Sequence, residues 1–255
     1  MLTVSRSLRV LVACEFSGIV REAFRRLGHD AVSCDLLETE IPGPHHLGDV
    51  RDVLGQGWDL IIAHPPCTYL CASGLHWNKR RPERAAQTTA ALEFIRELWA
   101  APCARLALEN PIGCIPSRLG LPATQIVQPY DFGDDASKAT CLWLRGLPKL
   151  TPTQRVPGRL VRLPNGKTVE RWGNQLDSGQ SNLPPSADRW ALRSRTFPGL
   201  AEAMAAQWGG RVTRTTFLPA VKPDALSPHR GPTPAPLPPR GSASPVQLNL
   251  NLVTL

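Results

Sequence analysis

Residues 8–35 read LRVLVACEFSGIVREAFRRLGHDAVSCD, and this stretch alternates strand-like and helix-like patterns. LRVLVAC (8–14) is a short run of β-branched residues and leucine, which predicts a buried strand. Apolar residues then recur at helical spacing at Val20, Ala23, Phe24 and Leu27. We expect Ser17 to cap the start of this helix and Gly28 to end it. DAVSCD (30–35) predicts the next strand, so the stretch forms one strand, helix and strand unit.

The same alternation continues along the first half of the chain. WDLIIAH (58–64) and RLALEN (105–110) predict two further buried strands, and residues 83–99 between them predict an amphipathic helix. Strands that alternate with helices favour an α/β fold with a doubly wound, mostly parallel sheet. Ligands of such a sheet bind outside the carboxyl ends of its strands.

The unusual polar residues of the first half lie at these strand ends or in the loops that follow them. They are residues 15–18, Asp35, Asp49 in a Gly-Asp loop, residues 64–67, and Glu109 with Asn110. Surface loops in general contain glycine, proline and aspartate. They do not require a cysteine and a glutamate at two strand ends, so we predict that these residues build one site.

Gly18 and Asp35 fit a nucleotide-type cofactor. Gly18 stands between a strand and a helix, where a tight turn requires glycine, and Asp35 ends the next strand 17 positions later. An acidic residue in that place accepts hydrogen bonds from ribose hydroxyls. Asp49 is a candidate acceptor for an adenine amino group. These three residues alone fit several cofactors of this type.

The segment AHPPCTYLCASG (63–74) carries the strongest chemical signal. Pro65 and Pro66 fix the backbone after a buried strand, so they present Cys67 rigidly at the edge of the sheet. A cysteine beside a positively charged cofactor has the lowered thiol pKa that a nucleophile needs. The alternative is a buried structural cysteine.

Glu109 ends the strand that follows this segment. A carboxylate there can hydrogen-bond or protonate a ring nitrogen while a thiol adds to the ring, which is a reason to have both groups in one pocket. The alternative is an acidic residue at a helix N-terminus without a chemical role.

The order and spacing of these residues resemble the DNA cytosine-5 methyltransferases, particularly their compact phage and prophage members, over about residues 8–210. The resemblance implies a Rossmann-like methyltransferase fold that depends on S-adenosylmethionine. It implies that Cys67 adds to C6 of a flipped cytosine, that Glu109 engages N3, and that C5 then takes the methyl group.

The resemblance also assigns binding roles. It implies a cofactor site formed by Phe16, Ser17, Gly18, Asp35, Asp49 and Pro65, with Asp35 on the ribose and Asp49 on the adenine amino group. Lys138, in SKATCLWL (137–144), matches the family's basic motif and would position the base. Val20 and Arg21 stand where the family usually has further glycines, which predicts a different path for this loop.

The charge of the chain is concentrated in its second half. Residues 1–136 carry 13 Lys and Arg against 16 Asp and Glu, whereas residues 137–218 carry 13 against 4. A basic segment interleaved with Trp172 and Trp190 favours binding of a polyanion, here double-stranded DNA. A solvated basic face is the alternative.

These patterns divide the chain into four parts. We expect a catalytic, cofactor-binding domain over residues 1–149 and a small basic target-recognition region over 150–195, with a hairpin turn at Pro164, Asn165 and Gly166. Residues 196–218 would form a helix that returns to the catalytic domain. Residues 219–255 contain nine prolines up to position 245 and predict a disordered tail.

The tail ends in a second resemblance. QLNLNL, from Gln247 to Leu252, resembles the short peptides with which bacterial polymerases and repair proteins bind the replicative sliding clamp. A tail with leucines at alternate positions by chance is the alternative.

Composition and terminal sequence indicate the location of the protein and the state of its cysteines. The chain has no apolar run of membrane-spanning length, no recognisable signal peptide, and seven cysteines without a disulfide-framework spacing. We therefore expect a cytoplasmic protein with free thiols, associated with the nucleoid when it binds DNA, without a membrane partner and as a monomer.

The sequence also allows other functions. A catalytically silent DNA- or clamp-binding module, and a methyltransferase that acts on a free pyrimidine nucleotide, both keep the fold. Methylation of an exocyclic amino group requires Asp or Asn before the two prolines and an aromatic residue after them, where this chain has His64 and Cys67. A zinc module from Cys67, Cys71, Cys103 and Cys114 lacks the tight spacing of structural zinc sites, so we expect no metal.

Overall fold

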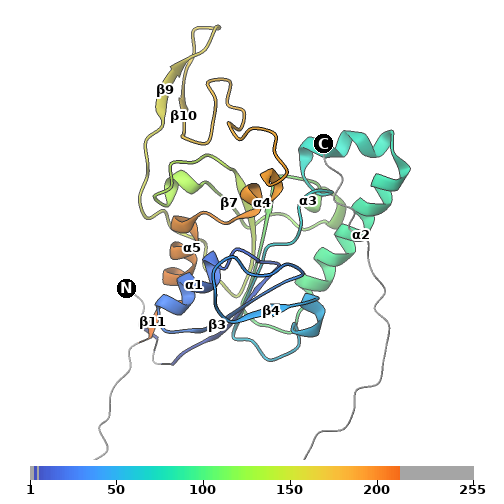
Figure 1. Ribbon diagram of the computed structural model, residues 1–255, viewed down its shortest axis with the longest axis vertical. Helices are drawn as coiled ribbons and strands as arrows, with labels where there is room; N and C mark the ends of the chain where they lie inside the picture. The colour runs from blue at the N-terminus through green and yellow to red at the C-terminus, as the bar shows by residue number, and fades with distance from the viewer. Residues whose placement is uncertain (1–2, 5, 213–255) are drawn as a thin grey trace, which may run out of the picture. The chain divides into compact units, whose positions relative to one another are not determined.

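A seven-stranded sheet forms the centre of the chain (Figure 1). The computed structural model describes residues 3–4 and 6–212, all of which belong to one unit, Met1–Arg214. The strands are β2 (Arg9–Ala13), β3 (Asp30–Asp35), β4 (His45–Leu47), β5 (Leu60–Ala63), β6 (Leu106–Pro111), β7 (Gln125–Val127) and β8 (Thr140–Arg145). Their order is β4-β3-β2-β5-β6-β8-β7, and β8 is the one strand of this sheet that runs opposite to the other six. The predicted doubly wound, mostly parallel α/β sheet is confirmed.

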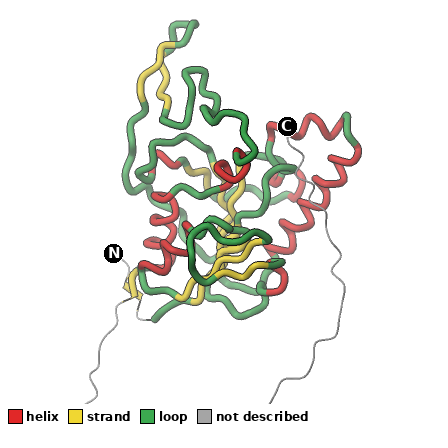
Figure 2. The backbone as a smooth tube through the Cα atoms, in the orientation of Figure 1, coloured by secondary structure: helices red, strands yellow, loops and turns green. Residues whose placement is uncertain are grey.

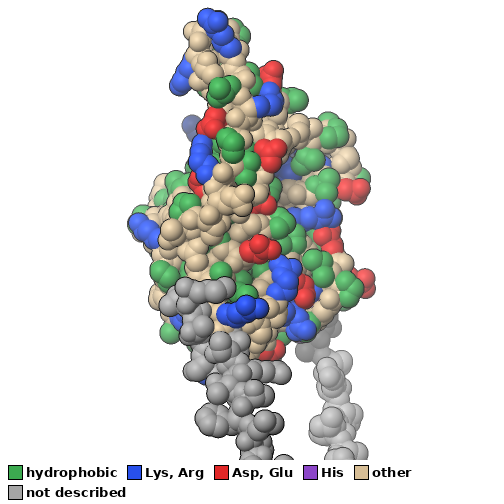
Figure 3. All heavy atoms as spheres, turned by 90° about the vertical axis from the view of Figure 1, so that its left-hand side faces the viewer, with side chains coloured by type: hydrophobic (Ala, Val, Ile, Leu, Met, Phe, Trp, Pro, Cys, Tyr) green, Lys and Arg blue, Asp and Glu red, His purple; other side chains and the backbone are tan. Residues whose placement is uncertain are grey.

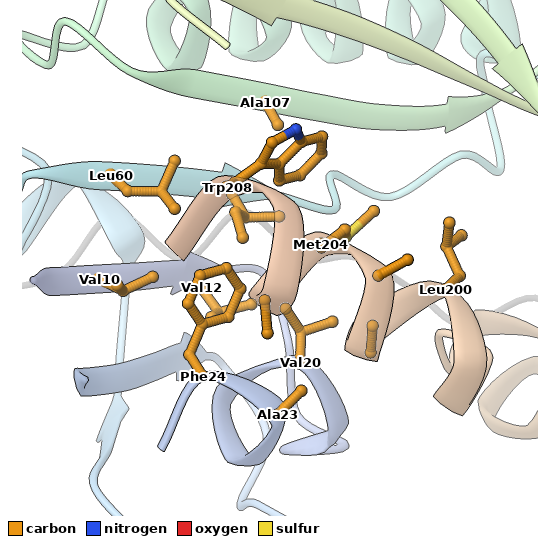
Figure 4. Packing of buried hydrophobic residues seen from close by; sticks show 14 of the residues in the cluster. Val10, Val12, Val20, Ala23, Phe24, Leu60, Ala107, Leu200, Met204 and Trp208 are labelled. Carbon is orange, nitrogen blue, oxygen red and sulfur yellow. The ribbon is translucent and has the colours of Figure 1, made fainter. Parts of the chain in front are cut away.

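Helices cover both faces of this sheet (Figure 2). Because side chains alternate along a strand, residues 10, 12, 60 and 62 face one core and residues 11, 13, 61 and 63 face the other. The first core is completed by α1 (Ile19–Arg26) and α5 (Pro198–Met204), as Figure 4 shows. The second core is completed by α2 (Pro82–Trp99) and α3 (Ile115–Leu119). The helix expected over residues 83–99 is therefore confirmed.

The remaining elements are short. They are β1 (Thr3–Val4) paired with β11 (Arg211–Val212), α4 (Arg189–Ser194), the 3₁₀ helices Val50–Asp52, Ala72–Lys79 and Pro129–Asp131, and a π-helical turn, Ala205–Gly209, that continues α5. Within residues 196–218, where a returning helix was expected, α5 and this turn form a helix over residues 198–209.

A hairpin formed by β9 (Arg159–Arg162) and β10 (Thr168–Arg171) extends from the second half of the chain (Figure 1). Its turn contains the predicted Pro164, Asn165 and Gly166, and Gly166 has the positive φ of 82° that favours glycine. The predicted hairpin is confirmed. Basic side chains are prominent at its end in the space-filling view of Figure 3.

The start of α1 differs from the prediction that Ser17 is its N-cap. The N-cap residue is Gly18, whose φ of 75° places it in the left-handed region. The buried carboxylate of Glu15 instead accepts the N–H groups of Val20 at 2.6 Å and Arg21 at 3.3 Å. An anion is a stronger acceptor at a helix N-terminus than a hydroxyl group, so Glu15 takes the capping role. The expected stop at Gly28 is confirmed, because this residue follows the C-cap with a φ of 94°.

Arg21 is buried completely below the loop that follows β3. Its guanidinium donates to Ser33 Oγ at 2.8 Å, Thr39 Oγ1 at 3.1 Å and the Ile41 carbonyl. A Cβ atom at Gly18 would lie 2.6 Å from this guanidinium, so the glycine leaves the space that Arg21 fills. This is the physical reason for an arginine at a position where the resembling family has glycine.

No helix among residues 3–4 and 6–212 is long and apolar enough to span a membrane. The expected tail over residues 219–255, including the clamp-like peptide at 247–252, lies outside the described residues.

Replacing Arg21 with methionine is expected to lower the free energy of unfolding by about 3 kcal/mol, because buried acceptors around it lose a charged donor. Urea unfolding of Arg21→Met measures this change. Arg25→Met is the matched control on the same helix, since Arg25 is exposed and, among residues 3–4 and 6–212, pairs with Glu22 alone, at 3.4 Å. Equal midpoints for the two variants would contradict the structural role of Arg21.

Candidate functional site

The site lies where the strand order reverses. The chain proceeds from β2 to β3 and β4 on one side, and β5 then returns to pair with β2 and leads to β6 on the other side. Ala13 is opposite Ala63, and Ala63 is opposite Leu108, so the carboxyl ends of β2, β5 and β6 are adjacent. A crevice at such a switch point is the usual ligand site of an open α/β sheet.

The loop after β5 is held rigidly against the end of β6. Asn110 is buried and its Nδ2 donates to the Pro65 carbonyl at 2.8 Å. The Cys114 N–H donates to the Leu70 carbonyl at 2.9 Å, while a Cβ atom at Gly113 would lie only 2.0 Å from the same oxygen. Glycine is therefore required for this close approach, and the loop is fixed at both ends around Cys67.

Cys67 is half-buried and carries an activated thiol. A hydrogen bond from Cys71 lowers the pKa of Cys67, and the charges of Lys138 and Arg193 lower it further. Burial and the charge of Glu109 act in the opposite direction, and the resulting pKa is about 7. A substantial share of the thiol is therefore the reactive thiolate near neutral pH. The partner Cys71 has a raised pKa, chiefly because it donates that hydrogen bond to Cys67.

Glu109 lies on β6 beside His64, the residue after β5. Burial alone would raise the pKa of Glu109, but the hydrogen bond and charge of His64, the charge of Lys138 and a hydrogen bond from Thr140 hold this pKa below its usual value. The carboxyl group is then an ionised acceptor, and His64 Nδ1 donates to its Oε2 at 3.1 Å. Glu109 and Cys67 are near enough for the charge of one to shift the pKa of the other.

Lys138 lies near both Cys67 and Glu109. Its Nζ donates to the Arg193 carbonyl at 2.9 Å and lies 6.0 Å from the centre of the Phe197 ring. Its charge acts on both Cys67 and Glu109. The structure thus brings together the three residues that the sequence predicted as catalytic.

Most residues predicted to bind a cofactor end or follow β2, β3 and β4, which are neighbours in the sheet, whereas Pro65 follows β5, the strand next to β2. Burial raises the pKa of Asp35, and its Oδ1 accepts the Leu37 N–H at 3.0 Å. Among the described residues no ion pair is recorded for Asp35, so acceptor positions remain for hydroxyl donors. Asp49 differs, because its two oxygens accept the Arg51 N–H and guanidinium, each at 2.9 Å.

The segment containing residues 189–195 joins these two groups of residues. Trp190 lies 5.8 Å from Phe16 between ring centres, and Arg195 forms a two-point ion pair with Glu40 at 2.8 and 2.7 Å. Arg193 in the same segment receives the hydrogen bond of Lys138. A part of the basic second half therefore contacts both the catalytic residues and the loop beside Phe16.

The two tryptophans of the basic half have different environments. Trp172 is buried and stacks on Tyr130 with a centroid distance of 4.0 Å, while its Nε1 donates to the Val156 carbonyl. It supports the base of the hairpin. Trp190 is 44% exposed and borders the site.

Of the four cysteines considered for a zinc module, Cys67 and Cys71 are hydrogen-bonded to each other, whereas Cys103 lies apart from them. Cys103 precedes β6 and donates to the Trp58 carbonyl at 3.2 Å, at the end of the sheet opposite to Cys67. Within residues 3–4 and 6–212, no group of three or more His, Cys, Asp or Glu side chains has a metal-binding arrangement.

Glu15 and His64 belong to the segments predicted to build the site, but their roles were not predicted from the sequence, and neither was the contact of Trp190 with Phe16. His64 had a detectable signal, because a polar ring directly follows four buried apolar residues and precedes the two prolines. The capping role of Glu15 and the contact of Trp190 depend on tertiary structure.

Comparison with known proteins gives limited similarity. No protein-family model and no curated protein matches the chain. Two solved structures are similar to part of it: an E. coli protein described as a DNA modification methyltransferase encoded within a prophage, and the Entamoeba histolytica methyltransferase EhMeth. They are 17% and 15% identical, with TM-scores of 0.39 and 0.38 over 60% of this chain. The matches span 53% and 58% of those two proteins, so they carry no argument about activity.

The lowered pKa predicts that iodoacetamide alkylates Cys67 before the other cysteines, with a rate midpoint near pH 7. Peptide mass spectrometry after timed labelling measures the rate at each cysteine. Cys34 is the internal control, because burial raises its pKa to about 12.

The same experiment tests Lys138. Lys138→Met removes a charge that stabilises the thiolate, so the midpoint of Cys67 alkylation is expected to move to higher pH. The exposed Lys149→Met serves as the matched control and is expected to leave the midpoint unchanged. An unchanged midpoint in Lys138→Met would contradict the proposed electrostatic contact.

Proposed function

We propose that this protein is an S-adenosylmethionine-dependent DNA methyltransferase that modifies C5 of cytosine through a covalent adduct with Cys67. The observation that carries this proposal is the activated Cys67 thiol, with a pKa of about 7, beside Glu109 and Lys138 at the switch point of the sheet. A soft nucleophile next to a carboxyl group suits addition to an electron-poor ring.

The proposed reaction begins with the Cys67 thiolate, which forms a bond to C6 of the cytosine. The electron pair of the C5–C6 double bond shifts toward C4, and N3 takes up a proton from solvent. The ionised Glu109 carboxylate accepts a hydrogen bond from this N3–H, which stabilises an enamine with a nucleophilic C5. S-adenosylmethionine, when bound, would supply the electrophilic methyl group to C5 and leave as S-adenosylhomocysteine. Loss of the C5 proton to solvent then expels Cys67 as thiolate, and N3 returns its proton to solvent.

Rigid positioning suits this role of Cys67. The bond from Asn110 to the Pro65 carbonyl and the close approach at Gly113 fix the loop before any substrate is present. A fixed nucleophile lowers the entropic cost of reaching the reacting geometry. We assign Lys138 the role of positioning the base, because its charge already acts on both Cys67 and Glu109.

The residues after β2, β3 and β4 fit the nucleoside part of S-adenosylmethionine. The Asp35 carboxylate has acceptor positions for the two ribose hydroxyls, and the half-buried Phe16 ring offers an apolar face to adenine. Ser17, Gly18 and Pro65 would complete the wall of this site, and Asp49 remains the predicted acceptor for the adenine amino group.

Double-stranded DNA is the substrate that the charge distribution favours. The hairpin carries Arg162 and Lys167, for which no ion pair is recorded among the described residues, whereas Arg159 pairs with Asp177. Free cations on a protruding hairpin suit phosphate contacts. Extraction of the cytosine from the duplex is required because C6 is otherwise stacked. We therefore propose residues 150–195 as the target-recognition region, residues 1–149 as the catalytic part and 196–218 as its returning helix.

The alternatives fit less well. A silent DNA-binding module does not require an activated thiol beside a buried carboxylate, and a free pyrimidine nucleotide does not require the basic second half. Binding of the sliding clamp through residues 247–252, a cytoplasmic location near the nucleoid and a monomeric state remain proposals from the sequence alone.

Expression of the chain in a bacterium that lacks cytosine methylation is expected to produce 5-methylcytosine in DNA. Nucleoside mass spectrometry measures the product. Cys67→Ala is expected to abolish it, and Glu109→Gln is expected to lower it by about 100-fold or more, since the neutral amide lacks the negative charge that stabilises a protonated N3.

Cys103→Ala is the matched control for these two variants, because it removes a thiol at the opposite end of the sheet. Methylation that persists in Cys67→Ala would overturn the covalent mechanism. A folded wild-type chain that binds S-adenosylmethionine and DNA but yields no modified base would overturn the proposed activity.

A further inference from the structure

His64 is buried in the site but has no role in the reaction outlined above. Its side chain is 7% exposed, although histidine in a protein is usually only partly buried. It directly follows β5 and precedes Pro65, so the rigid loop that carries Cys67 begins at this residue.

The backbone and one edge of the ring are fixed. The His64 N–H donates to the Ala13 carbonyl at 2.9 Å, which continues the pairing of β5 with β2. On the ring, Nδ1 lies 3.1 Å from Glu109 Oε2, and the Glu109 side chain is only 16% exposed. Since β5 and β6 are parallel and in register at Ala63 and Leu108, the next residues on both strands meet on the same face.

The opposite edge of the ring is also enclosed. Nε2 is buried and has no hydrogen-bond partner among the described residues. Glu15, which follows β2, is a titratable group whose pKa is lowered by the charge of His64. Burial raises the pKa of Glu15, while the charge of His64 and the N–H groups of Val20 and Arg21 partly oppose this.

Each element next to His64 contributes a charged or titratable group. Glu15 lies toward β2, Glu109 on β6, Lys138 before β8, and Cys67 in its own loop. Within the described part of the chain, Glu109 is the one residue that forms a direct hydrogen bond with the ring.

We propose that His64 is the positioning residue for Glu109: its Nδ1–H holds Oε2 and thereby aims the carboxyl group at the ring nitrogen of the substrate. This inference rests on the proposed function. A carboxylate held on one oxygen cannot rotate away when the substrate enters, and the same bond favours its ionised form before the substrate arrives. His64 acts through Glu109 and touches no reacting atom.

The position of the donor on the ring gives a sharp test. His64→Asn places an amide N–H near the position of Nδ1, whereas His64→Gln places it near Nε2, and His64→Leu removes it. We expect kcat to remain within a few-fold of wild type in His64→Asn and to fall by about 10- to 100-fold in the other two, as for loss of an orienting partner. KM for DNA and for S-adenosylmethionine is expected to stay unchanged in all three.

Equal losses of kcat in His64→Asn and His64→Leu, or no loss in either, would overturn the inference. Urea unfolding of the three variants shows whether the order of activity follows stability instead. If kcat tracks the unfolding midpoints across the series, the role of His64 is structural and the inference fails.

An independent measurement separates this inference from the proposed activity. Nitrogen-15 NMR of histidine in the full chain, which has 6 histidines, identifies the His64 signal by its loss in His64→Asn. We expect a protonated Nδ1 whose signal shifts in Glu109→Gln. An unprotonated Nδ1 overturns the inference even in an active enzyme. A protonated, shifting Nδ1 in a chain that does not methylate DNA shows that the contact is correct and that the proposed function has failed.

Discussion

The parallel register of β5 between β2 and β6 is the constraint on which the site depends. Ala63 lies opposite both Ala13 and Leu108, so three strands end together at the switch point of the sheet. This register puts His64 beside Glu109 and places the Pro-Pro-Cys loop where Asn110 can bind the Pro65 carbonyl. A shift by one residue would turn Glu109 into the opposite core, because successive strand residues face opposite sides. The chemistry therefore depends on backbone pairing in a core made of apolar side chains.

Electrostatic balance follows from this geometry. Glu109 alone would raise the pKa of Cys67 and suppress the thiolate, but Lys138, Arg193 and the Cys71 thiol outweigh it. The same lysine helps to keep Glu109 ionised despite burial. The positive charge of Lys138 thus stabilises both the Cys67 thiolate and the Glu109 carboxylate, and this allows the two negative groups to lie close to each other. The segment containing Trp190 and Arg195 connects this centre to the loop beside Phe16 through the Trp190–Phe16 and Arg195–Glu40 contacts.

The sequence predicted the parts of the fold that have strong periodicity. The apolar runs of β2, β3, β5 and β6 and the long helix α2 were recognisable, whereas β4 and β7 have three residues each and give no pattern. Ser17 was wrongly expected to cap α1, because the competing acceptor, Glu15, is placed by the turn of the chain at Gly18. Cys67 and Glu109 were predicted to share a site because parallel strands end at one edge. The His64 contact depends on which residues of two strands lie opposite each other, and a single sequence does not contain that register.

Trapping the covalent bond between Cys67 and cytosine C6 tests the covalent mechanism without relying on the methylated product. A duplex with 5-fluorocytosine blocks the last step, because C5 then has no proton to lose after it receives the methyl group. We expect that, with S-adenosylmethionine present, a complex forms that survives denaturation and whose adduct mass lies on the peptide containing Cys67. Absence of the complex from a protein that binds both the duplex and S-adenosylmethionine, or an adduct on another residue, would contradict the covalent mechanism.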